Sequence, residues 1–196
     1  MLRKSLVILI ACLLGLMSFN CTSNNSKDKA ESKNNNEKKV LISYFSWSGN
    51  TEKVAKHIAE TIKGDIFKIE AVKKYPTDYK ECTRVAREER RNKVRPDLTK
   101  KVSKFEQYDI IFIGYPIWWS DMPMPVYTFL ESYNFKGKTV IPFITHGGSD
   151  ESGTSDIIRD KLSGATVLKY LSIYDDYIDN ANSDIDTWLK EIGIKK

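Results

Sequence analysis

The chain has 196 residues, of which 41% are hydrophobic and 11% aromatic, enough to bury the core of one domain. Its formal charge of +5 is uneven, because residues 27–39 hold five lysines and three acids. Residues 40–196 carry 24 basic and 23 acidic groups, which leaves this part of the chain almost neutral. It therefore lacks the concentrated basic face of nucleic-acid-binding proteins, and we expect no nucleic-acid partner.

The start of the chain resembles a bacterial export signal. Two basic residues precede residues 5–17, an apolar run of 13, which is too short for a membrane span of about 20 residues. The run ends shortly before Cys21, and this arrangement resembles the site of lipoprotein processing, in which a lipidated cysteine becomes the first residue. Cleavage of a plain secretory signal near Ser18 is the alternative. We predict a signal peptide over residues 1–20 and an exported lipoprotein anchored to a membrane, periplasmic or on the outer surface.

The segment that follows is polar. Residues 22–39 are almost wholly Ser, Asn, Lys, Asp and Glu, and they bury too little apolar area to offset the entropy of ordering. We predict that residues 21–39 form the lipidated cysteine and a disordered tether, and that residues 40–196 form the folded domain. Because Cys12 lies in the removed segment, Cys82 has no partner for an internal disulfide, and we expect it to be a small core residue.

From residue 40 onward, apolar runs alternate with helical stripes. Five strands are expected, at residues 40–45, 66–69, 110–113, 139–144 and 165–171. Five helices are expected, at residues 50–63, 77–93, 123–133, 155–162 and 183–192. The alternation predicts an α/β domain with a doubly wound, five-stranded parallel sheet and helices on both faces. Pro142 lies inside the fourth predicted strand and, since it has no amide donor, it indicates an edge or a bulge there.

The loop between the first predicted strand and the first helix resembles an anion site. It consists of Ser46, Trp47, Ser48, Gly49, Asn50 and Thr51. Unpaired amides and the helix dipole favour negative charge at a helix start, and Gly49 allows close approach of the backbone. The loop has no lysine, and neither the triphosphate pattern G-x-x-x-x-G-K nor the dinucleotide pattern G-x-G-x-x-G is present. These features indicate a site for one dianionic monophosphate; an ordinary N-cap by Ser48 or Asn50 is the alternative.

Two further loops follow the third and fourth predicted strands, at the edge where open parallel sheets bind ligands. The first holds Pro116, Ile117, Trp118 and Trp119. The second holds Thr145, His146, Gly147, Gly148 and Ser149. Two adjacent tryptophans indicate a flat aromatic ligand stacked on one of them, with packing of both rings on the domain as the alternative. His146 is a candidate proton donor, and no Cys or His spacing indicates a metal site.

Together, the Ser-x-Ser-Gly-Asn-Thr, Pro-Ile-Trp-Trp and Thr-x-Gly-Gly-Ser loops resemble the flavodoxin family, in its Pro-Ile-Trp-Trp subfamily, over about residues 40–192. The resemblance implies a flavodoxin-like sheet of strand order 2-1-3-4-5 and flavin mononucleotide (FMN) as the cofactor. It implies that the first loop holds the FMN phosphate and that the other two flank the flavin, so that all fifteen loop residues bind the cofactor. The domain departs from electron-carrier flavodoxins in not being strongly acidic.

The function implied by this resemblance is electron transfer by a lipid-anchored FMN protein. The cofactor would supply the redox chemistry, so we expect no catalytic residue. The expected partner is a redox protein or a quinone-like acceptor. One alternative is an FMN-dependent NAD(P)H:quinone-type oxidoreductase, and another is a binding module that kept the fold and lost the flavin.

The charge of the second predicted helix and its surroundings is a separate feature. Residues 73–104 carry 12 basic and 5 acidic groups. We interpret this stretch as a solvated helix face, with a patch facing an anionic membrane or an acidic redox partner as the alternative.

Overall fold

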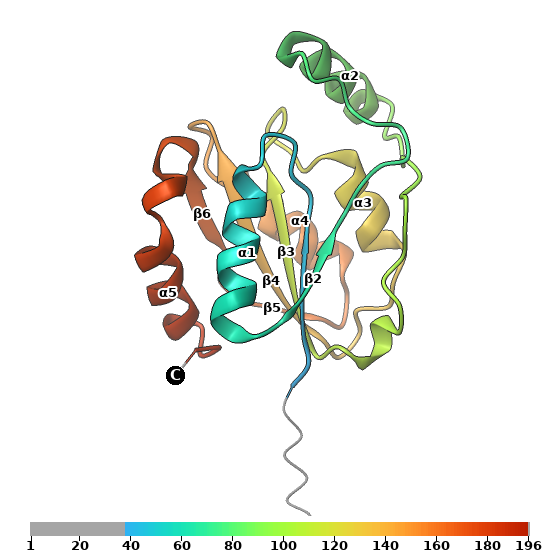
Figure 1. The fold of residues 1–196 in the computed structure, drawn as a ribbon. Coiled ribbons are helices and arrows are strands. Elements are labelled where there is room, and N and C mark those ends of the chain that lie inside the picture. The colour runs from blue at the N-terminus through green and yellow to red at the C-terminus, as the bar shows by residue number, and fades with distance from the viewer. Residues whose placement is uncertain (1–37, 196) are drawn as a thin grey trace, which may run out of the picture. The chain divides into compact units, whose positions relative to one another are not determined.

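A parallel β-sheet forms the centre of the computed structural model, which describes residues 38–195 (Figure 1). The strands are β1 (Val40–Tyr44), β2 (Asp65–Lys68), β3 (Ile110–Pro116), β4 (Thr139–His146), β5 (Thr166–Val167) and β6 (Leu171–Tyr174). Their order is β2-β1-β3-β4-β5, with β6 also paired to β4, and every one of these pairings is parallel. The predicted strand order 2-1-3-4-5 is confirmed. The fifth predicted strand, residues 165–171, contains β5 and only the first residue of β6, so the rest of β6 was not predicted.

The predicted signal peptide over residues 1–20, Cys21 and the predicted tether as far as residue 37 lie outside the described residues. Lys39, which we placed in the tether, is bound to the domain. Its amide donates to Asp109 Oδ2 at 2.9 Å, and its carbonyl accepts from the amide of Ile110. The domain therefore includes at least one residue before the predicted boundary at residue 40.

Four of the five α-helices within residues 38–195 cover the two faces of the sheet. The helices are α1 (Asn50–Ile62), α2 (Tyr79–Arg91), α3 (Met124–Glu131), α4 (Thr154–Lys161) and α5 (Asn182–Glu191). The helices α1 and α5 share one apolar cluster with the sheet, whereas α3 and α4 share the other. Two short 3₁₀ helices, η1 (Phe105–Gln107) and η2 (Asp175–Asn180), were not predicted, because one or two turns are too short to show periodicity. The predicted doubly wound architecture is confirmed.

The continuous apolar run of β3 follows from its central position. Successive side chains of a strand point to opposite faces. Ile111 and Ile113 accordingly belong to the cluster under α3 and α4, whereas Ile110 and Phe112 belong to the cluster under α1 and α5. All four are almost fully buried. A strand covered on both faces has no polar side, so apolar residues follow one another without alternation.

Pro142 occupies an interior strand beside a bulge. Leu168 N donates to Val140 O at 2.9 Å, so Val140 directs its backbone groups toward the fifth strand. Because alternate residues of a strand face the same neighbour, Pro142 does so as well. The pairing of β4 with β5 ends where Val140 lies opposite Val167, and the pairing with β6 begins where Phe143 lies opposite Leu171. Between these two points β4 has one residue fewer than the neighbouring chain. The missing donor therefore coincides with the break between β5 and β6, so the predicted bulge is correct and the predicted edge is wrong.

The helix α2 stands above the carboxyl edge of the sheet and not over either face (Figure 1). Its N-cap, Asp78, accepts from the amide of Glu81 at 2.9 Å. Side-chain contacts connect α2 to the rest of the domain: Tyr75 OH donates to Glu89 Oε2 at 2.5 Å, and Arg90 Nε donates to Asp121 Oδ2 at 3.0 Å. This position brings α2 beside the loops that leave the carboxyl ends of the strands.

The contact of Gly114 with Phe143 generates a stability prediction. A Cβ atom at Gly114 would lie 2.0 Å from Cζ of the fully buried Phe143 ring, which has no room to move away. Gly114→Ala should destabilise the protein by about 1–3 kcal/mol, as overpacking of cores does. At Gly147, where nothing lies within 4 Å, the same change should stay within about 0.5 kcal/mol. Urea unfolding measures both, and equal midpoints for the two variants would contradict the packing argument.

Candidate ligand-binding site

The three predicted site loops meet at the carboxyl edge of the sheet. The hydroxyls of Thr51 and Thr145, 94 residues apart in the chain, share a hydrogen bond of 2.9 Å between their Oγ1 atoms. Ile117 N donates to Thr145 O at 2.9 Å, which connects the second loop to the third. Thr145 therefore contacts both other loops, and the structure brings together the residues that we singled out. Their role in binding a cofactor stays a prediction.

The first loop has the geometry of an anion site. Gly49 is the N-cap of α1 with φ 96°, a left-handed conformation that favours glycine, and no side chain caps the helix. The alternative of an N-cap by Ser48 or Asn50 is therefore wrong. Lys53 N donates to Gly49 O at 3.0 Å as the first intrahelical bond. The three preceding amides of the first turn, at residues 50–52, have no acceptor within the helix and are available to a ligand.

Hydroxyl groups add donors to this loop. Thr51 is 1% exposed and so is Thr145, and a bond shared by two hydroxyls uses only one of their two protons. The other proton has no acceptor among residues 38–195. Ser48 is exposed, whereas Ser46 Oγ accepts from Gly49 N at 3.1 Å and holds the turn in shape.

One acidic residue lies in the first turn of α1. The carboxylate of Glu52 is bound to Lys56 at 2.7 Å and to Lys68 at 3.3 Å. The hydrogen bond from Lys56 is the main cause that lowers the pKa of Glu52 below its usual value, although burial opposes it. Glu52 is therefore ionised at neutral pH, and two ammonium groups offset its repulsion of a bound anion.

The adjacent tryptophans of the second loop have different environments. Trp118 packs edge-on against Phe45 and Tyr75, with ring centroids 5.3 and 5.1 Å apart. Trp119 is 45% exposed; its Nε1 donates to Thr83 O at 2.9 Å, and the guanidinium of Arg87 lies 5.1 Å from its ring centroid. Both rings therefore contact the domain, although Trp119 is the more exposed, and stacking of a flat ligand on either ring stays a prediction.

The second loop is strained and held by a carboxylate. Trp119 and Ser120 have φ values of 55° and 56°, which side chains other than glycine adopt at a cost of roughly 1–3 kcal/mol each. Asp121, which follows them, accepts from Met122 N and Tyr127 OH at 2.7 Å each through Oδ1. Burial is the main cause that raises the pKa of Tyr127, followed by its hydrogen bond to Asp121. Backbone strain stabilised in this way is common at binding sites.

The predicted second and third loops begin later than expected, because Pro116 is the last residue of β3 and Thr145 and His146 are the last residues of β4. His146 and the two glycines that follow it lie at the rim of the site. His146 Nδ1 accepts from Gly148 N at 3.0 Å, and the ring lies 5.8 Å from that of Tyr174. This bond favours the tautomer with the proton on Nε2. Gly148 has φ 118°, and Gly147 has open space where a Cβ would stand. The other histidine, His57, is bound to Asp186 at 3.1 Å and lies outside the loops.

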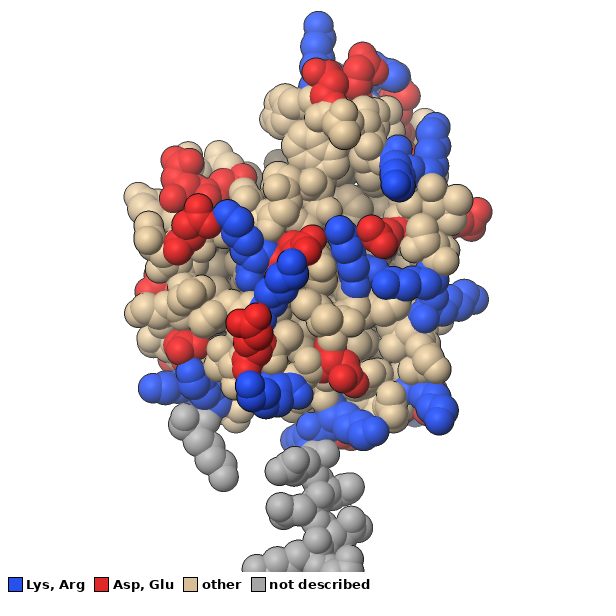
Figure 2. All heavy atoms as spheres, in the orientation of Figure 1, with Lys and Arg blue, Asp and Glu red and all other residues tan. Residues whose placement is uncertain are grey.

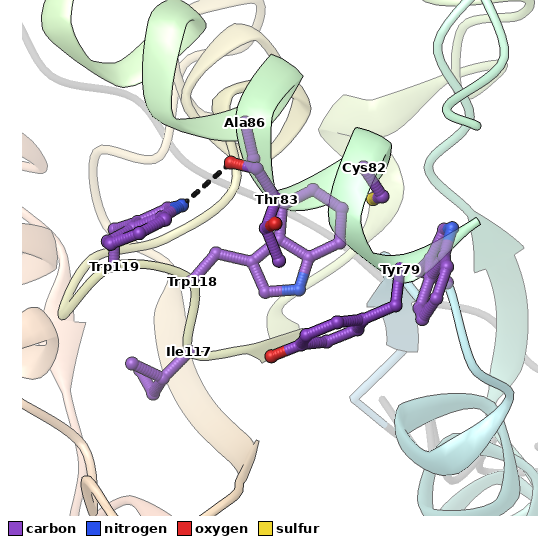
Figure 3. Close-up of a pocket in the computed structure, with 8 residues that line it drawn as sticks. Tyr79, Cys82, Thr83, Ala86, Ile117, Trp118 and Trp119 are labelled. Carbon is purple, nitrogen blue, oxygen red and sulfur yellow. Dashed lines mark hydrogen bonds between the residues drawn. The ribbon is translucent and has the colours of Figure 1, made fainter. Parts of the chain in front are cut away.

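A hollow of about 360 Å³ lies beside the second loop, and α2 forms one of its walls. The loops contribute Trp47 and residues 117–119, while α2 contributes Tyr79, Cys82, Thr83 and Ala86 (Figure 3). We call this hollow the α2 slot. The α2 residues were missed as site residues, although their spacing of three, one and three marks a single helix face. Their stripe is also typical of a core face, and only the fold shows that it borders a hollow.

Among residues 38–195, charged side chains form no metal site, and those of α2 are of both signs. No group of three or more His, Cys, Asp or Glu residues there could hold a metal ion. The arginines of α2 are partly neutralised, since Arg84 pairs with Glu81 and Glu88. Figure 2 shows basic and acidic side chains interspersed over the viewed face. This arrangement favours the interpretation of α2 as a solvated helix with mixed charge.

Comparisons with known proteins point to one family. A family model described as flavodoxin matches residues 39–192. A flavoprotein structure from Bacteroides uniformis is 33% identical, covering 78% of this chain and 98% of that chain with a TM-score of 0.68. A flavoprotein structure from Bacteroides eggerthii is 29% identical, and the match covers 80% of this chain and 99% of that chain with a TM-score of 0.69. A Lactobacillus acidophilus flavoprotein in complex with FMN is 25% identical, with coverages of 74% and 99% and a TM-score of 0.61. No curated protein matches the chain.

The hydrogen bonds of Asp121 generate a prediction about the second loop. Asp121→Ala should destabilise the protein by about 1.5–3 kcal/mol, because it removes a charged acceptor from an amide and a phenol at a side chain that is 16% exposed. Arg90→Ala, which breaks only the more exposed ion pair, should cost less than about 1 kcal/mol. Denaturant unfolding followed by tryptophan fluorescence compares the two. Equal losses would show that Asp121 acts mainly through Arg90.

Proposed function

The chain belongs to the flavodoxin family, and from this we propose that it is an FMN-binding, electron-transfer flavoprotein anchored to a membrane by lipid on Cys21. The observation that carries the proposal is the first loop. Its uncapped helix start, left-handed Gly49 and buried Thr51–Thr145 pair form a cradle of donors. The cofactor supplies the redox chemistry when bound, and the chain binds, orients and shields it.

The residues fit FMN, because the first loop offers donors for one phosphate group and two further loops lie beside it. Donors without a cation suit one phosphate dianion, since fixed amides and hydroxyls replace its hydration. The loops at residues 116–119 and 145–149 would flank the flavin ring. The Lactobacillus acidophilus flavoprotein that this chain resembles was crystallised in complex with FMN, which supports the same cofactor here.

Membrane anchoring rests on the start of the sequence. Cys21 follows the apolar run of residues 5–17 and precedes a polar segment. Between residues 38 and 195, none of the helices has both the length and the apolar character needed to cross a bilayer. Lipid on Cys21 would therefore attach the domain, through residues 22–37, to the surface of a membrane where it meets a redox protein or a quinone-like acceptor.

The α2 slot favours a second candidate function. A hollow beside the second loop, lined largely by aromatic rings, suits a small substrate better than a docked protein. In this case the protein is an FMN-dependent oxidoreductase that passes two electrons and a proton from NAD(P)H, with one proton from solvent, to a quinone, which becomes a hydroquinone. Oxidation of NADH or NADPH by quinone in the presence of the purified protein alone distinguishes this candidate from an electron carrier.

The cofactor itself provides the first test of the proposal. The purified protein should show a flavin absorption spectrum, and the released cofactor should have the mass of FMN. A colourless protein that does not take up added FMN, or a released cofactor with the mass of FAD, would contradict the proposal.

We predict that the first loop contributes more to FMN affinity than the tryptophans. Ser48→Ala combined with Thr51→Val should weaken binding by roughly 3–6 kcal/mol, because two charge-assisted hydrogen bonds of about 1.5–3 kcal/mol each are lost. Trp119→Ala should cost only about 0.5–1.5 kcal/mol beyond lost contact area. Titration of the apoprotein measures these affinities. Riboflavin, which lacks the phosphate, should bind far more weakly than FMN, and comparable affinities would show that the loop is not a phosphate site.

We predict that fatty acid is attached at Cys21. Labelled palmitate should enter the wild-type chain but not Cys21→Ser, and the wild type should partition into a detergent phase, because more than one acyl chain gives stable anchoring. Cys82→Ala is the matched control and should keep the label, since Cys82 is buried in the domain. Label retained by Cys21→Ser would place the modification elsewhere.

A further inference from the structure

The α2 slot is neutral and largely aromatic. Four of its eight lining residues have aromatic side chains, and none is charged. Its volume of about 360 Å³ lies within the range of about 300–1,000 Å³ that is usual for small-molecule pockets. None of the hydroxyl residues of the first loop and none of residues 145–149 lines it. The slot is therefore a compartment on the α2 side of the second loop, apart from the phosphate cradle.

One indole N–H in the slot has no acceptor from the protein among residues 38–195. Of the three tryptophans that line it, Trp47 donates to Pro76 O at 2.8 Å and Trp119 donates to Thr83 O at 2.9 Å. Trp118 Nε1 donates to no acceptor among the described residues. Figure 3 shows this nitrogen on the side of the indole ring nearest Tyr79, which lines the same slot. A ligand that offers a hydrogen-bond acceptor here would satisfy the donor.

The walls of the slot are held in place before any ligand enters. Trp119 has a left-handed backbone, and its bond to Thr83 O fixes it to α2. The ring of Trp47, which also lines the slot, is fixed by its bond to Pro76 O. A pocket whose aromatic walls are already positioned loses little conformational entropy on binding. The strained backbone at Trp119 is stabilised by these contacts and gives the loop its approach to α2.

We propose that the α2 slot binds a neutral, planar, conjugated ring compound that carries a ring carbonyl, the chemistry of a quinone. The aromatic walls provide flat apolar surface for its ring, and Trp118 Nε1 provides the donor for its carbonyl oxygen. The absence of lining charges disfavours the phosphates of a nucleotide. The inference deepens the second candidate function and rests on FMN being held by the three loops.

The cysteine in the slot is compatible with such a ligand. Quinones react with thiolates, but Cys82 is only 3% exposed, and burial, followed by the charge of Glu89, raises the pKa of its thiol to about 11. The thiol is therefore neutral at pH 7 and a poor nucleophile. Binding in the slot is non-covalent and reversible.

Filling the slot provides the main test. Thr83→Trp places a large ring inside it, whereas Arg91→Trp adds the same ring to an exposed position of α2 outside the slot. Dissociation constants of 1,4-naphthoquinone and of FMN are measured separately, by equilibrium dialysis with the purified full chain. Thr83→Trp should raise the dissociation constant of naphthoquinone by about tenfold or more, whereas Arg91→Trp should change it by less than about twofold. FMN affinity should change in neither variant, and circular dichroism confirms that both variants fold.

A second variant tests the hydrogen bond. Trp118→Phe keeps an aromatic ring and removes the N–H group. It should raise the dissociation constant of 1,4-naphthoquinone by roughly two- to tenfold more than that of naphthalene, which has no carbonyl group. This is the effect of one neutral hydrogen bond. Equal effects on the two compounds would overturn the role of Trp118 Nε1.

The other outcomes are also decisive. Failure of naphthoquinone to bind FMN-loaded wild type, or equal binding to wild type and Thr83→Trp, overturns the inference and leaves FMN binding intact. If naphthoquinone displaces FMN, and Thr83→Trp binds FMN more weakly than the wild type does, the slot belongs to the flavin ring and the inference is overturned as well. Failure of FMN itself to bind is a separate result that contradicts the proposed function.

Discussion

The parallel pairing of β1, β3 and β4 determines where the site lies. In the registers of these strands, Tyr44 is level with Gly114, and Pro116 is level with Thr145. All three strands therefore end at the same edge, and each leads into one of the three loops. The buried bond between Thr51 and Thr145 is possible only because of this arrangement. Reversal of any one strand would take its loop to the opposite end of the domain.

The interior of the sheet accommodates two residues that oppose regular strand structure. Gly114 leaves room for the ring of Phe143, which is fully buried between β3 and the helices α1 and α5. Pro142, its neighbour along β4, has no donor for the fifth strand, and that strand is interrupted at the same level. The packing at the centre of the sheet is thus retained, whereas the edge strand is interrupted between β5 and β6. An edge strand pairs on one side only, so fewer hydrogen bonds are lost there.

The position of α2 gives the carboxyl edge two different sides. On one side, the uncapped start of α1 and the hydroxyl pair suit an anion. On the other, aromatic rings and an indole donor without a protein acceptor among residues 38–195 suit a neutral ring. The second loop separates the two sides, and its backbone is held in a strained conformation by Asp121 and by the bond from Trp119 to α2. Changes in the contacts of α2 would therefore alter the second side more than the first.

The sequence by itself determined the features that depend on neighbouring residues. Apolar runs and helical stripes located β1 to β5 and the helices α1 to α5. The residues from Ser46 to Thr51 indicated an anion site because helix-start chemistry is local. The tertiary structure alone decided which side chains meet. It separated the half-buried Trp118 from the exposed Trp119, placed Gly49 and not a side chain at the start of α1, and divided the fifth strand opposite Pro142. It also turned the stripe of α2 toward a hollow and not a core. These outcomes depend on contacts between segments tens of residues apart, and periodicity along the chain carries no information about which distant surface a helix or ring will face.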